Sequence, residues 1–335
     1  MFNPNYRITK YLLDCLERIA GEITLIKNKS VDVLIKTNLE SEAVNRSVHS
    51  STKIEGNELS LAQVQALGAH QNIIANKNQK MEVENYHEAL RFIIKNRKRP
   101  FTERNLLNIH KLISKNLLAS NRSGKYRTIQ NYIVNAKNIR IFTPPAPDNV
   151  AKRMTNLFRW LKNADDVHPV IRSAIFHHEF VTIHPFIDGN GRAARAASQW
   201  LLFKKNYEPA FTLGIDEFFA NDRDRYYEKI QQARELDGDY TYWVEYVAEG
   251  LLDSTRNITS RLKAKTLQFK RKNIALTPKQ EELLKILNTK HLGSTQISKL
   301  MNINRARVNQ LINPLVKSGL VVKDGKTRGA RYRLV

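Results

Sequence analysis

The sequence predicts a mainly α-helical protein with a small α+β module at its C-terminal end. Apolar residues recur at intervals of three and four along most of the chain, which is the spacing of one helix face, and strand-like alternation is rare. After residue 276 short helical stretches give way to two alternating runs around glycines. At 335 residues the chain is long enough for about two domains.

Composition narrows the class of protein. The 41% hydrophobic and 26% charged residues are ordinary globular proportions, and no apolar run approaches the roughly 18 residues of a membrane helix. We therefore expect a soluble protein without a membrane partner. The N-terminus lacks the pattern of a secretory signal, and the lone Cys15 cannot form an internal disulfide, so a cytoplasmic location is the simplest expectation.

The net charge of +23 is concentrated near the C-terminus. Residues 256–335 hold 19 Lys and Arg against three acidic residues, whereas the rest of the chain carries 36 against 29. A basic module on a nearly balanced body is expected of a protein that binds a polyanion such as DNA. Solubility alone would also explain the charge.

The helical elements of the body follow in order, interrupted by one hairpin. Two apolar runs, Tyr132–Val134 and Ile139–Phe142, flank a polar turn at 135–138 and predict this hairpin. Thr102 with Asn105 is a weak N-cap, and Pro169 suits the first position of a helix. The predicted helices lie near residues 11–23, 44–54, 61–67, 82–95, 102–118, 154–161, 169–183, 192–205, 226–234 and 242–258.

Residues 184–195 (HPFIDGNGRAAR) carry the most chemistry in the sequence. Gly189 and Gly191 bracket Asn190 just before a helix, so unpaired backbone N–H groups and the positive end of the helix dipole would face one pocket, which suits a phosphate. Arg192 and Arg195 lie three residues apart and share a helix face, where two guanidiniums can hold the outer phosphates of a nucleotide.

Two further residues complete this constellation. Asp188 is the nearest hard oxygen ligand, and Mg²⁺ is commonly held by one or two carboxylates plus substrate phosphates. His184 is the available base for an attacking hydroxyl. A zinc site made of His177, His178 and His184 is the main chemical rival, but the sequence has no HExxH and no Cys partner for it. A single such feature is usually structural, whereas five features within twelve residues favour function.

The segment resembles the signature of the Fic family, His-x-Phe-x-Asp/Glu-Gly-Asn-Gly-Arg-x-x-Arg, and fills every defining position. The spacing of His177, Phe180 and Ile183 also resembles the family, as does the Gly124–Arg127 turn that precedes the hairpin. The resemblance covers most of residues 1–255. It implies an N-terminal helical region with an inhibitory motif over residues 1–100 and a Fic-type catalytic core over 101–255. Beyond it, the basic composition with few apolar residues predicts a linker or helix over 256–275, followed by a separate module over 276–335.

The resemblance implies that the protein moves AMP from ATP to a Ser, Thr or Tyr hydroxyl of a protein target, itself included, and releases pyrophosphate with the help of Mg²⁺. The relatives that transfer the γ-phosphate instead have Lys at the position of Gly191, so we do not expect kinase-type transfer. The implied roles are general base for His184, metal ligand for Asp188, anion hole for Gly189, Asn190 and Gly191, β- and γ-phosphate clamps for Arg192 and Arg195, and target flap for Ile139, Ile141 and Phe142.

Tyr226 and Tyr227 stand where the family places an aromatic residue near adenine. A pair of tyrosines that fills the core of a helix packing is an equally good explanation. Relatives have an Asn seven residues further on that binds adenine, whereas this chain has Arg234. This departure leaves the base specificity open.

Ser51 and Glu55 lie four residues apart and therefore share a helix face, and Gly56 would end that helix. Taken alone, they form an ordinary exposed helix end. Beside a Fic core they resemble the family's inhibitory motif, Ser/Thr-x-x-x-Glu-Gly/Asn. The resemblance implies that Glu55 pairs with Arg195, blocks the γ-phosphate position and, in some relatives, helps water to remove AMP.

The C-terminal module resembles a winged helix-turn-helix domain. Three short helices begin near residues 277, 294 and 304, and a hairpin follows around Gly325 and Gly329. Pro314 is expected to kink the third helix. Winged helices bind DNA or dock proteins, so both partners stay open. For DNA, the expected contacts are Arg305, Arg307, Asn309 and Gln310 in the major groove and Arg328 in the wing.

Two classes of function remain. The first is a self-inhibited protein adenylyltransferase. The second is a DNA-binding transcriptional regulator that uses its Fic core to sense ATP. The combination of His184, Asp188 and Arg195 favours the enzyme, because a sensor needs no general base. A homodimer is compatible with either function.

Overall fold

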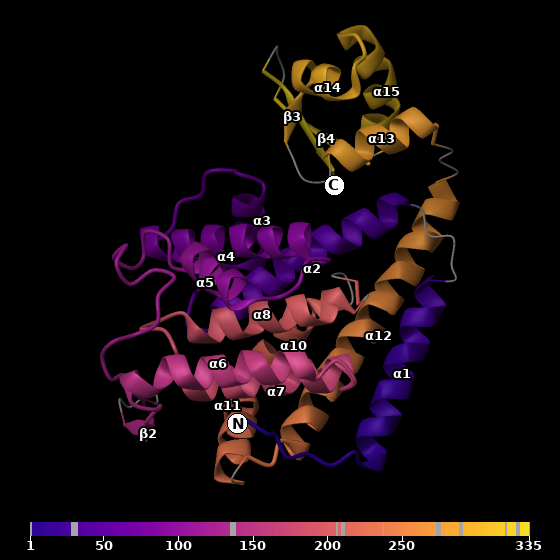
Figure 1. The fold of residues 1–335 in the computed structure, drawn as a ribbon. Coiled ribbons are helices and arrows are strands. Elements are labelled where there is room, and N and C mark those ends of the chain that lie inside the picture. Colours follow the sequence, from indigo (N-terminus) through magenta and orange to yellow (C-terminus); the bar gives the residue numbers. More distant parts are fainter. Residues whose placement is uncertain are drawn as a thin grey trace.

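The computed structural model describes most of the chain (Figure 1). Nineteen elements of secondary structure occur within it, and helices dominate as predicted. The described residues are 2–27, 33–134, 139–205, 207–208, 212–236, 238–272, 276–287, 291–318, 320–325 and 329–334.

Four helices form the N-terminal region. The predicted inward residues of the first helix, Leu12, Ile19 and Ile23, are buried, and this helix packs against the long helix α12. The second helix ends at Ile54, so that Ser51 lies in its last turn and Glu55 directly follows it. The bounds are α1 Lys10–Lys27, α2 Val33–Ile54, α3 Leu61–Gly68 and α4 Lys77–Asn96.

The hairpin forms where the sequence predicts it. After helix α5 (Glu103–Ile113), whose Thr102 and Asn105 make a capping box, strand β1 (Ile133–Val134) pairs antiparallel with β2 (Arg140–Phe142). The predicted turn at 135–138 lies outside the described residues. The strands are short because Pro144 and Pro145 cannot donate ladder hydrogen bonds. Helix α6 (Pro147–Asn163) follows, with its proline at the first position.

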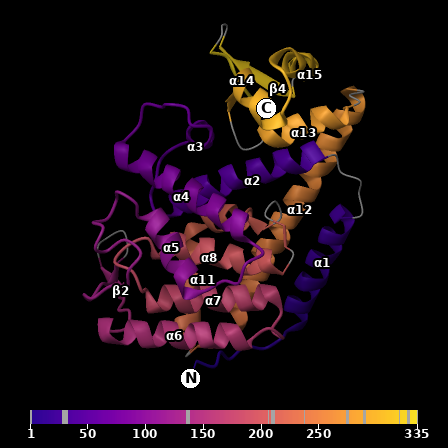
Figure 2. The same cartoon turned by 45° about the horizontal axis from the view of Figure 1, so that its top comes forward.

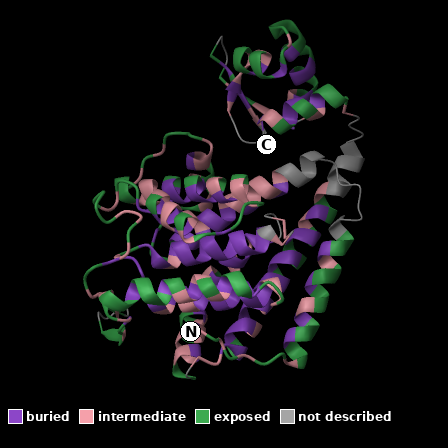
Figure 3. Ribbon diagram, viewed as in Figure 1, coloured by how far each residue is buried: buried purple, intermediate pink, exposed green. Residues whose placement is uncertain are grey.

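The central layer consists of α7 (Pro169–Ile183) and α8 (Asn190–Lys204), which pack closely on each other. Ala193, Ala194, Ala196 and Ala197 are all fully buried, and their small side chains allow the two backbones to approach. Most residues of α7 are buried as well, and Figure 3 shows α8 almost entirely in the colour of buried residues. The segment 184–189 that joins them is therefore attached at both ends to buried, closely packed helices.

The remaining helices of the body surround this layer and lead out of it. They are α10 (Ile215–Asn221), α11 (Arg223–Glu235) and α12 (Thr241–Lys272). The segment predicted as a basic linker or helix belongs to α12 up to Lys272, and residues 273–275 lie outside the described part. Among the described helices, none is both apolar and long enough to cross a membrane.

The C-terminal module has its own hydrophobic core. Its sheet has the strand order β3-β5-β4, and its α13 contacts α2, beside which the module lies in both views (Figures 1 and 2). The described part of the module contains three helices with a two-stranded hairpin after the third. Helix α15 continues through Pro314 to Lys317. The bounds are α13 Pro278–Leu287, β3 Leu292–Gly293, α14 Ser294–Met301, α15 Arg305–Lys317, β4 Val321–Asp324 and β5 Arg331–Leu334.

Candidate active site

Residues 184–189 turn sharply between α7 and α8. His184 ends α7 in the left-handed region at φ 51°, and Gly189 precedes α8 at φ 78°. A helix leaves its first backbone N–H groups without intrahelical partners, and Gly189 has no side chain to cap them. The positive end of α8 therefore opens toward the same side as the turn, as the two glycines of the motif predict.

Arg127 fastens this turn to the base of the hairpin. The side chain is buried, and its Nε donates to the carbonyl of His184 at 2.9 Å while its Nη1 donates to Ile129 at 3.1 Å. Its Nη2 donates to the carbonyl of Pro145. A buried guanidinium bonded to three carbonyl oxygens positions backbone, because removing it would leave each of those oxygens unpaired.

His110 fastens the other end of the turn. Its Nδ1 accepts from the backbone N–H of Gly124 at 2.9 Å, so its Nε2 carries the proton and donates to the carbonyl of Asp188 at 2.9 Å. The ring stacks on Phe186 with centroids 3.6 Å apart. Burial lowers the pKa of His110 to about 4, which keeps the imidazole neutral as both hydrogen bonds require.

The side chain of Asn190 is hydrogen-bonded within the turn itself. Its Oδ1 accepts from the N–H of Phe186 and its Nδ2 donates to the carbonyl of Phe186, both at 2.9 Å. The amide is thus used to close the turn. Only the backbone N–H of Asn190 can serve an anion in this arrangement.

His184 holds one ring nitrogen free of a proton. Its Nδ1 lies 3.3 Å from the carbonyl of Val181, and since a carbonyl only accepts, this nitrogen carries the proton and Nε2 carries the lone pair. Burial lowers the pKa of His184 to about 4, with Arg234 and Arg127 adding to the effect. The imidazole is therefore neutral near pH 7 and able to accept a proton.

The predicted contact between Glu55 and Arg195 is confirmed. Arg195 is buried, and its Nη2 donates to Oε1 of Glu55 at 2.7 Å and to the carbonyl of Ser51 at 2.9 Å. Its Nε donates to the hydroxyl of Ser51 at 2.7 Å. Burial favours a raised pKa for Glu55, but Arg195 and Arg192 outweigh it and the pKa lies below its ordinary value. The carboxylate is therefore ionised.

Gly191 allows Glu55 to come this close. A Cβ atom at position 191 would collide with Oε1 of Glu55 and would lie 3.1 Å from Nη1 of Arg195. Glu55 itself keeps 28% of its side chain exposed, whereas the side chain of Arg195 is only 1% exposed. The carboxylate thus covers the outer side of a guanidinium that is otherwise enclosed.

Arg192 has two acidic partners. Its Nη1 lies 3.0 Å from Oε1 of Glu82 on α4, and its Nη2 lies 3.4 Å from Oδ2 of Asp188. Glu82 also accepts from Nδ2 of Asn57 at 2.9 Å. Asp188 is the most open group of the site, with 66% of its side chain exposed. A carboxylate in that position can reach a cation brought in with a ligand.

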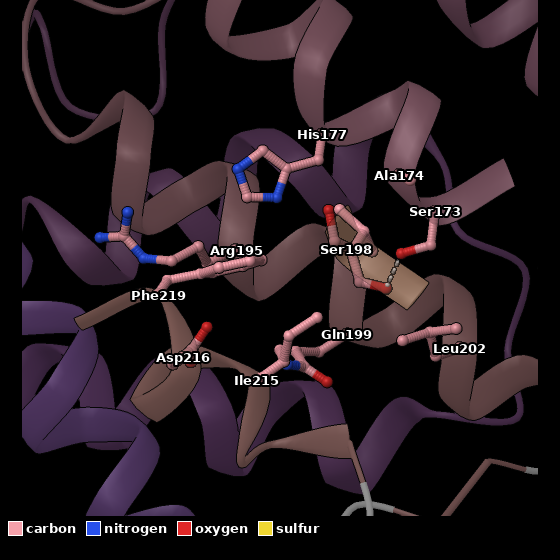
Figure 4. Close-up of a pocket in the computed structure, with 11 residues that line it drawn as sticks. Ser173, Ala174, His177, Arg195, Ser198, Gln199, Leu202, Ile215, Asp216 and Phe219 are labelled. Atoms are coloured by element: carbon pink, nitrogen blue, oxygen red, sulfur yellow. Dashed lines mark hydrogen bonds between the residues drawn. The ribbon is translucent and has the colours of Figure 1, made fainter. Parts of the chain in front are cut away.

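Asp216 lies on the buried side of Arg195, next to a small cavity of about 20 Å³ (Figure 4). It is fully buried and accepts from the hydroxyl of Ser47 on α2. Burial raises the pKa of Asp216 to about 6, an effect that the charge of Arg195 partly offsets. Helix α2 therefore contacts this polar pair twice, through Ser47 at Asp216 and through Ser51 at Arg195.

The structure separates the two predicted adenine tyrosines. Tyr226 is 1% exposed, stacks on Phe219 and bonds Nε2 of His177 through its hydroxyl at 2.8 Å, so the prediction that it faces adenine is wrong. Its ring serves as core. Tyr227 is 38% exposed and has the guanidinium of Arg223 over its ring at 5.4 Å. Of the two, only Tyr227 has a face that a base can reach.

His177 and His178, the other members of the rival zinc site, are buried in the core. Nε2 of His177 bonds the hydroxyl of Tyr226, and Nε2 of His178 lies 2.9 Å from the carbonyl of Ile230. Burial lowers the pKa of both imidazoles. Their contacts hold α7 against α11 and do not involve His184.

The flap residues divide between two faces of strand β2. Ile139 and Ile141 are exposed at 57% and 47%, as expected for a surface that receives another chain. Phe142 is half-buried and lies under the guanidinium of Arg234 at 3.9 Å. Alternate residues of a strand point to opposite faces, which explains this division.

Comparison with known proteins finds a family that part of the chain resembles. Residues 100–202 match the model of the Fic/DOC family. This segment, called the Fic domain below, includes the hairpin, the 184–189 turn and both arginines of α8.

Relatives of the Fic domain include proteins with a stated activity. The chain is 29% identical over 214 residues to Protein adenylyltransferase Fic of Nematostella vectensis, a match that covers 62% of this chain and 47% of that protein. It is 30% identical over 210 residues to Protein adenylyltransferase fic-1 of Caenorhabditis briggsae, covering 60% and 38%. The chain spans less than half the length of these relatives.

A solved structure extends the similarity beyond the Fic domain. A Fic family protein from Desulfovibrio desulfuricans G20 aligns with a TM-score of 0.67 at 25% identity, covering 100% of this chain and 98% of that chain. The match therefore includes the C-terminal module as well as the N-terminal helices.

Four side chains of the Fic domain site carry no signal in the sequence: Glu82, His110, Arg127 and Asp216. Arg127 belongs to the turn that precedes the hairpin, but nothing there indicates its bonds to the 184–189 turn. The others lie 21 or more residues from the 184–195 motif along the chain. Glu82 and His110 reach the site because α4 and α5 pack on α8, and Asp216 reaches it because α10 packs on α2.

The residues predicted to bind DNA lie apart from the Fic domain site, on α15. Arg305, Arg307, Asn309 and Gln310 are all exposed. Nη1 of Arg307 donates to Gln310 at 2.9 Å, and Nη2 of Arg305 lies 3.4 Å from the hydroxyl of Ser294. Arg328 lies outside the described residues.

Proposed function

We propose that the protein is a self-inhibited adenylyltransferase that moves AMP from ATP to a Ser, Thr or Tyr hydroxyl of a protein. The observation that carries this proposal is the convergence of His184, Arg192 and Arg195 around the first turn of α8, with Glu55 bonded to Arg195. The similarity to two proteins named as adenylyltransferases supports the same chemistry.

In the proposed reaction the target hydroxyl oxygen attacks the α-phosphorus of ATP. A new P–O bond forms to the target, the bond from the α-phosphorus to the bridging oxygen of the β-phosphate breaks, and pyrophosphate leaves. Nε2 of His184 takes the proton of the hydroxyl as the bond forms. The neutral state of the imidazole and the fixed tautomer suit this role.

The phosphates bind at the start of α8. Its first backbone N–H groups and its dipole favour negative charge, and they act best where they are fixed before the substrate arrives. Arg192 and Arg195 bind the β- and γ-phosphates. The bonds of the 184–189 turn to Arg127 and His110 keep this cradle in place, so little reorganisation is needed when charge develops.

Mg²⁺ fits the exposed carboxylate of Asp188, because this ion commonly takes one carboxylate together with phosphate oxygens. When bound, it would neutralise part of the charge of the triphosphate. Asp188 is the residue that would hold it.

Glu55 is the inhibitory residue in this proposal. An Arg195 that is bonded to Glu55 cannot also clamp the γ-phosphate, so ATP binds in a pose that does not align the α-phosphorus with the attacking hydroxyl. The proposal includes the reverse reaction, in which Glu55 helps water to remove AMP from the target. The exposed Ile139 and Ile141 of β2 hold the target segment.

The proposal is tested with ATP labelled at the α-phosphate. The parent protein, incubated with this ATP and Mg²⁺ in the presence of candidate target proteins, is expected to transfer a low level of label to protein. ATP labelled at the γ-phosphate should transfer none. Protein label from the γ-phosphate would contradict AMP transfer. Absence of protein label from either nucleotide, in the Glu55→Gly variant as well as in the parent, would contradict it too.

A second function concerns the C-terminal module, which we propose binds DNA. The observation that favours it is the exposure of Arg305, Arg307, Asn309 and Gln310 on one helix of a strongly basic module. These side chain types read base edges and phosphates.

The prediction is a salt-dependent loss of affinity on substitution. The double variant Arg305→Ala, Arg307→Ala in the full chain should bind duplex DNA about tenfold or more weakly. Its affinity should also depend less steeply on salt, because a protein with fewer phosphate contacts releases fewer counterions from the DNA when it binds. Fluorescence anisotropy at two salt concentrations measures both. Lys95→Ala on α4 serves as the control for loss of positive charge elsewhere. Equal affinity of the double variant and the parent would contradict DNA binding through α15.

A further inference from the structure

Arg234 connects three parts of the site that lie on different elements. It lies in the last turn of α11. Its Nη2 donates to the carbonyl of Val181 at 3.1 Å, and its Nε donates to the hydroxyl of Thr182 at 3.1 Å. Its guanidinium carbon lies 3.9 Å from the centre of the Phe142 ring in the flap.

The carbonyl of Val181 is shared with the base. Nδ1 of His184 lies 3.3 Å from the same oxygen that accepts from Arg234. This carbonyl lies in the last turn of α7, where helix carbonyls lack intrahelical partners and where a positive charge is favourable. Arg234 thus caps α7 at the point that orients the imidazole.

The contact with Phe142 is the link to the flap. A planar guanidinium stacks on an aromatic ring, and the contact gains strength when it is removed from water. Burial lowers the pKa of Arg234 to about 10, which shows how far this guanidinium is desolvated. Phe142 lies on the face of β2 opposite to Ile139 and Ile141. The strand is therefore fastened on one face and open on the other.

We propose that Arg234 is a positioning residue that clamps the flap strand β2 to the turn that carries His184. The clamp sets the distance between the strand that presents the target hydroxyl and the imidazole that takes its proton. The role in the reaction rests on the proposed AMP transfer, whereas the clamp itself is a property of the unliganded protein.

Hydrogen exchange of backbone amides tests the clamp and does not require that the protein transfers AMP. Arg234→Met removes the planar charge and the donors but keeps an unbranched side chain. We expect the flap amides of residues 139–142 to exchange about tenfold faster in this variant, which corresponds to ~1.4 kcal/mol. Arg225→Met is the matched control, because Arg225 lies on the same helix with its guanidinium over Tyr246 at 5.1 Å and does not touch the flap. Unchanged flap exchange in Arg234→Met, or equal loosening by Arg225→Met, would overturn the clamp.

Kinetics then test the positioning role. In a Glu55→Gly background, Arg234→Met and Phe142→Leu should each raise KM for the protein target about tenfold and change KM for ATP less than twofold. The double variant should be no worse than the more severe single variant, because both changes break one contact. Additive effects, or a lower melting temperature with both KM values unchanged, would overturn it. If the Glu55→Gly protein transfers no AMP, the proposed role of Arg234 in the reaction fails together with the proposed function. The hydrogen-exchange measurement still tests the clamp by itself.

The acid limb of the pH–rate profile distinguishes the effect of the Arg234 charge on the pKa of His184 from the contact of Arg234 with the flap. The charged groups that face His184 are Arg234 on α11, Arg127 before the flap and Glu55 after α2. Loss of one cation in Arg234→Met should raise the pKa of the base, so the acid limb moves to higher pH. Arg234→Lys keeps the charge but lacks the planar fork, and should loosen the flap with no shift of the limb. A shift of the same size in both variants would contradict the assignment.

Discussion

His184→Ala is expected to reduce AMP transfer by a factor of about 10² to 10⁴, the range that a positioned general base contributes. Affinity for ATP should change little, because Nε2 of His184 acts on the target hydroxyl and the phosphates are held by α8 and its two arginines. Transfer from α-labelled ATP measures the first quantity and calorimetric titration with ATP measures the second. The ratio of the two changes assigns His184 to the chemical step.

The control for this variant is His70→Ala, which removes an exposed imidazole after α3. It should transfer label at the parent's rate. The pH profile of the parent gives a second check. Since the pKa of His184 is lowered to about 4, the neutral base persists from pH 8 down to about 5, and transfer should fall only as pH drops through about 4. Transfer by His184→Ala at the parent's rate would contradict the assignment, whereas an acid limb near 6.5 would show that burial does not lower the pKa of this base.

Glu55→Gly is expected to raise AMP transfer at least tenfold. The substitution removes the carboxylate that lies 2.7 Å from Nη2 of Arg195 and leaves this guanidinium to clamp the γ-phosphate. A gain of about 1.4 kcal/mol in the population of the productive pose is enough for a tenfold change. Initial rates with α-labelled ATP at saturating target measure the effect.

A glycine at the end of α2 can also act by fraying the helix, which lowers stability without raising activity. Lys53→Gly is the matched control, since Lys53 is exposed in the last turn of α2 and does not contact Arg195. Thermal melts of both variants give the cost of the glycine. If Glu55→Gly melts lower and labels no faster than Lys53→Gly, the self-inhibition proposal is wrong.

The sequence alone was sufficient to predict those features that depend on residues close to one another in the chain. The hairpin strands follow from two short apolar runs around a polar turn, and the capping box of Thr102 and Asn105 follows from their spacing. The separation of four residues predicts that Ser51 and Glu55 share a helix face, whereas their common partner, Arg195, was implied only by the family resemblance. Each of these depends on neighbours within a few positions, which is the range that sequence periodicity describes.

Burial of individual side chains was decided by packing. Tyr226 and Tyr227 are adjacent and chemically identical, so no local pattern separates them, yet one fills the core against Phe219 and the other faces outward. The side chain of Asn190 likewise turned inward to Phe186, because a sharp turn must pair its own peptide groups before it can serve a ligand.

The sequence by itself predicted the helical fold and the resemblance of residues 184–195 to the Fic signature, and that resemblance implied that Glu55 meets Arg195. The tertiary structure alone decided which side chains hold that segment in place. Glu82, His110, Arg127 and Arg234 come from four separate elements, and their bonds to the site form only once those elements pack around α7 and α8. Hydrogen bonds between residues far apart in the chain depend on three-dimensional proximity, and proximity is set by the packing of the whole core.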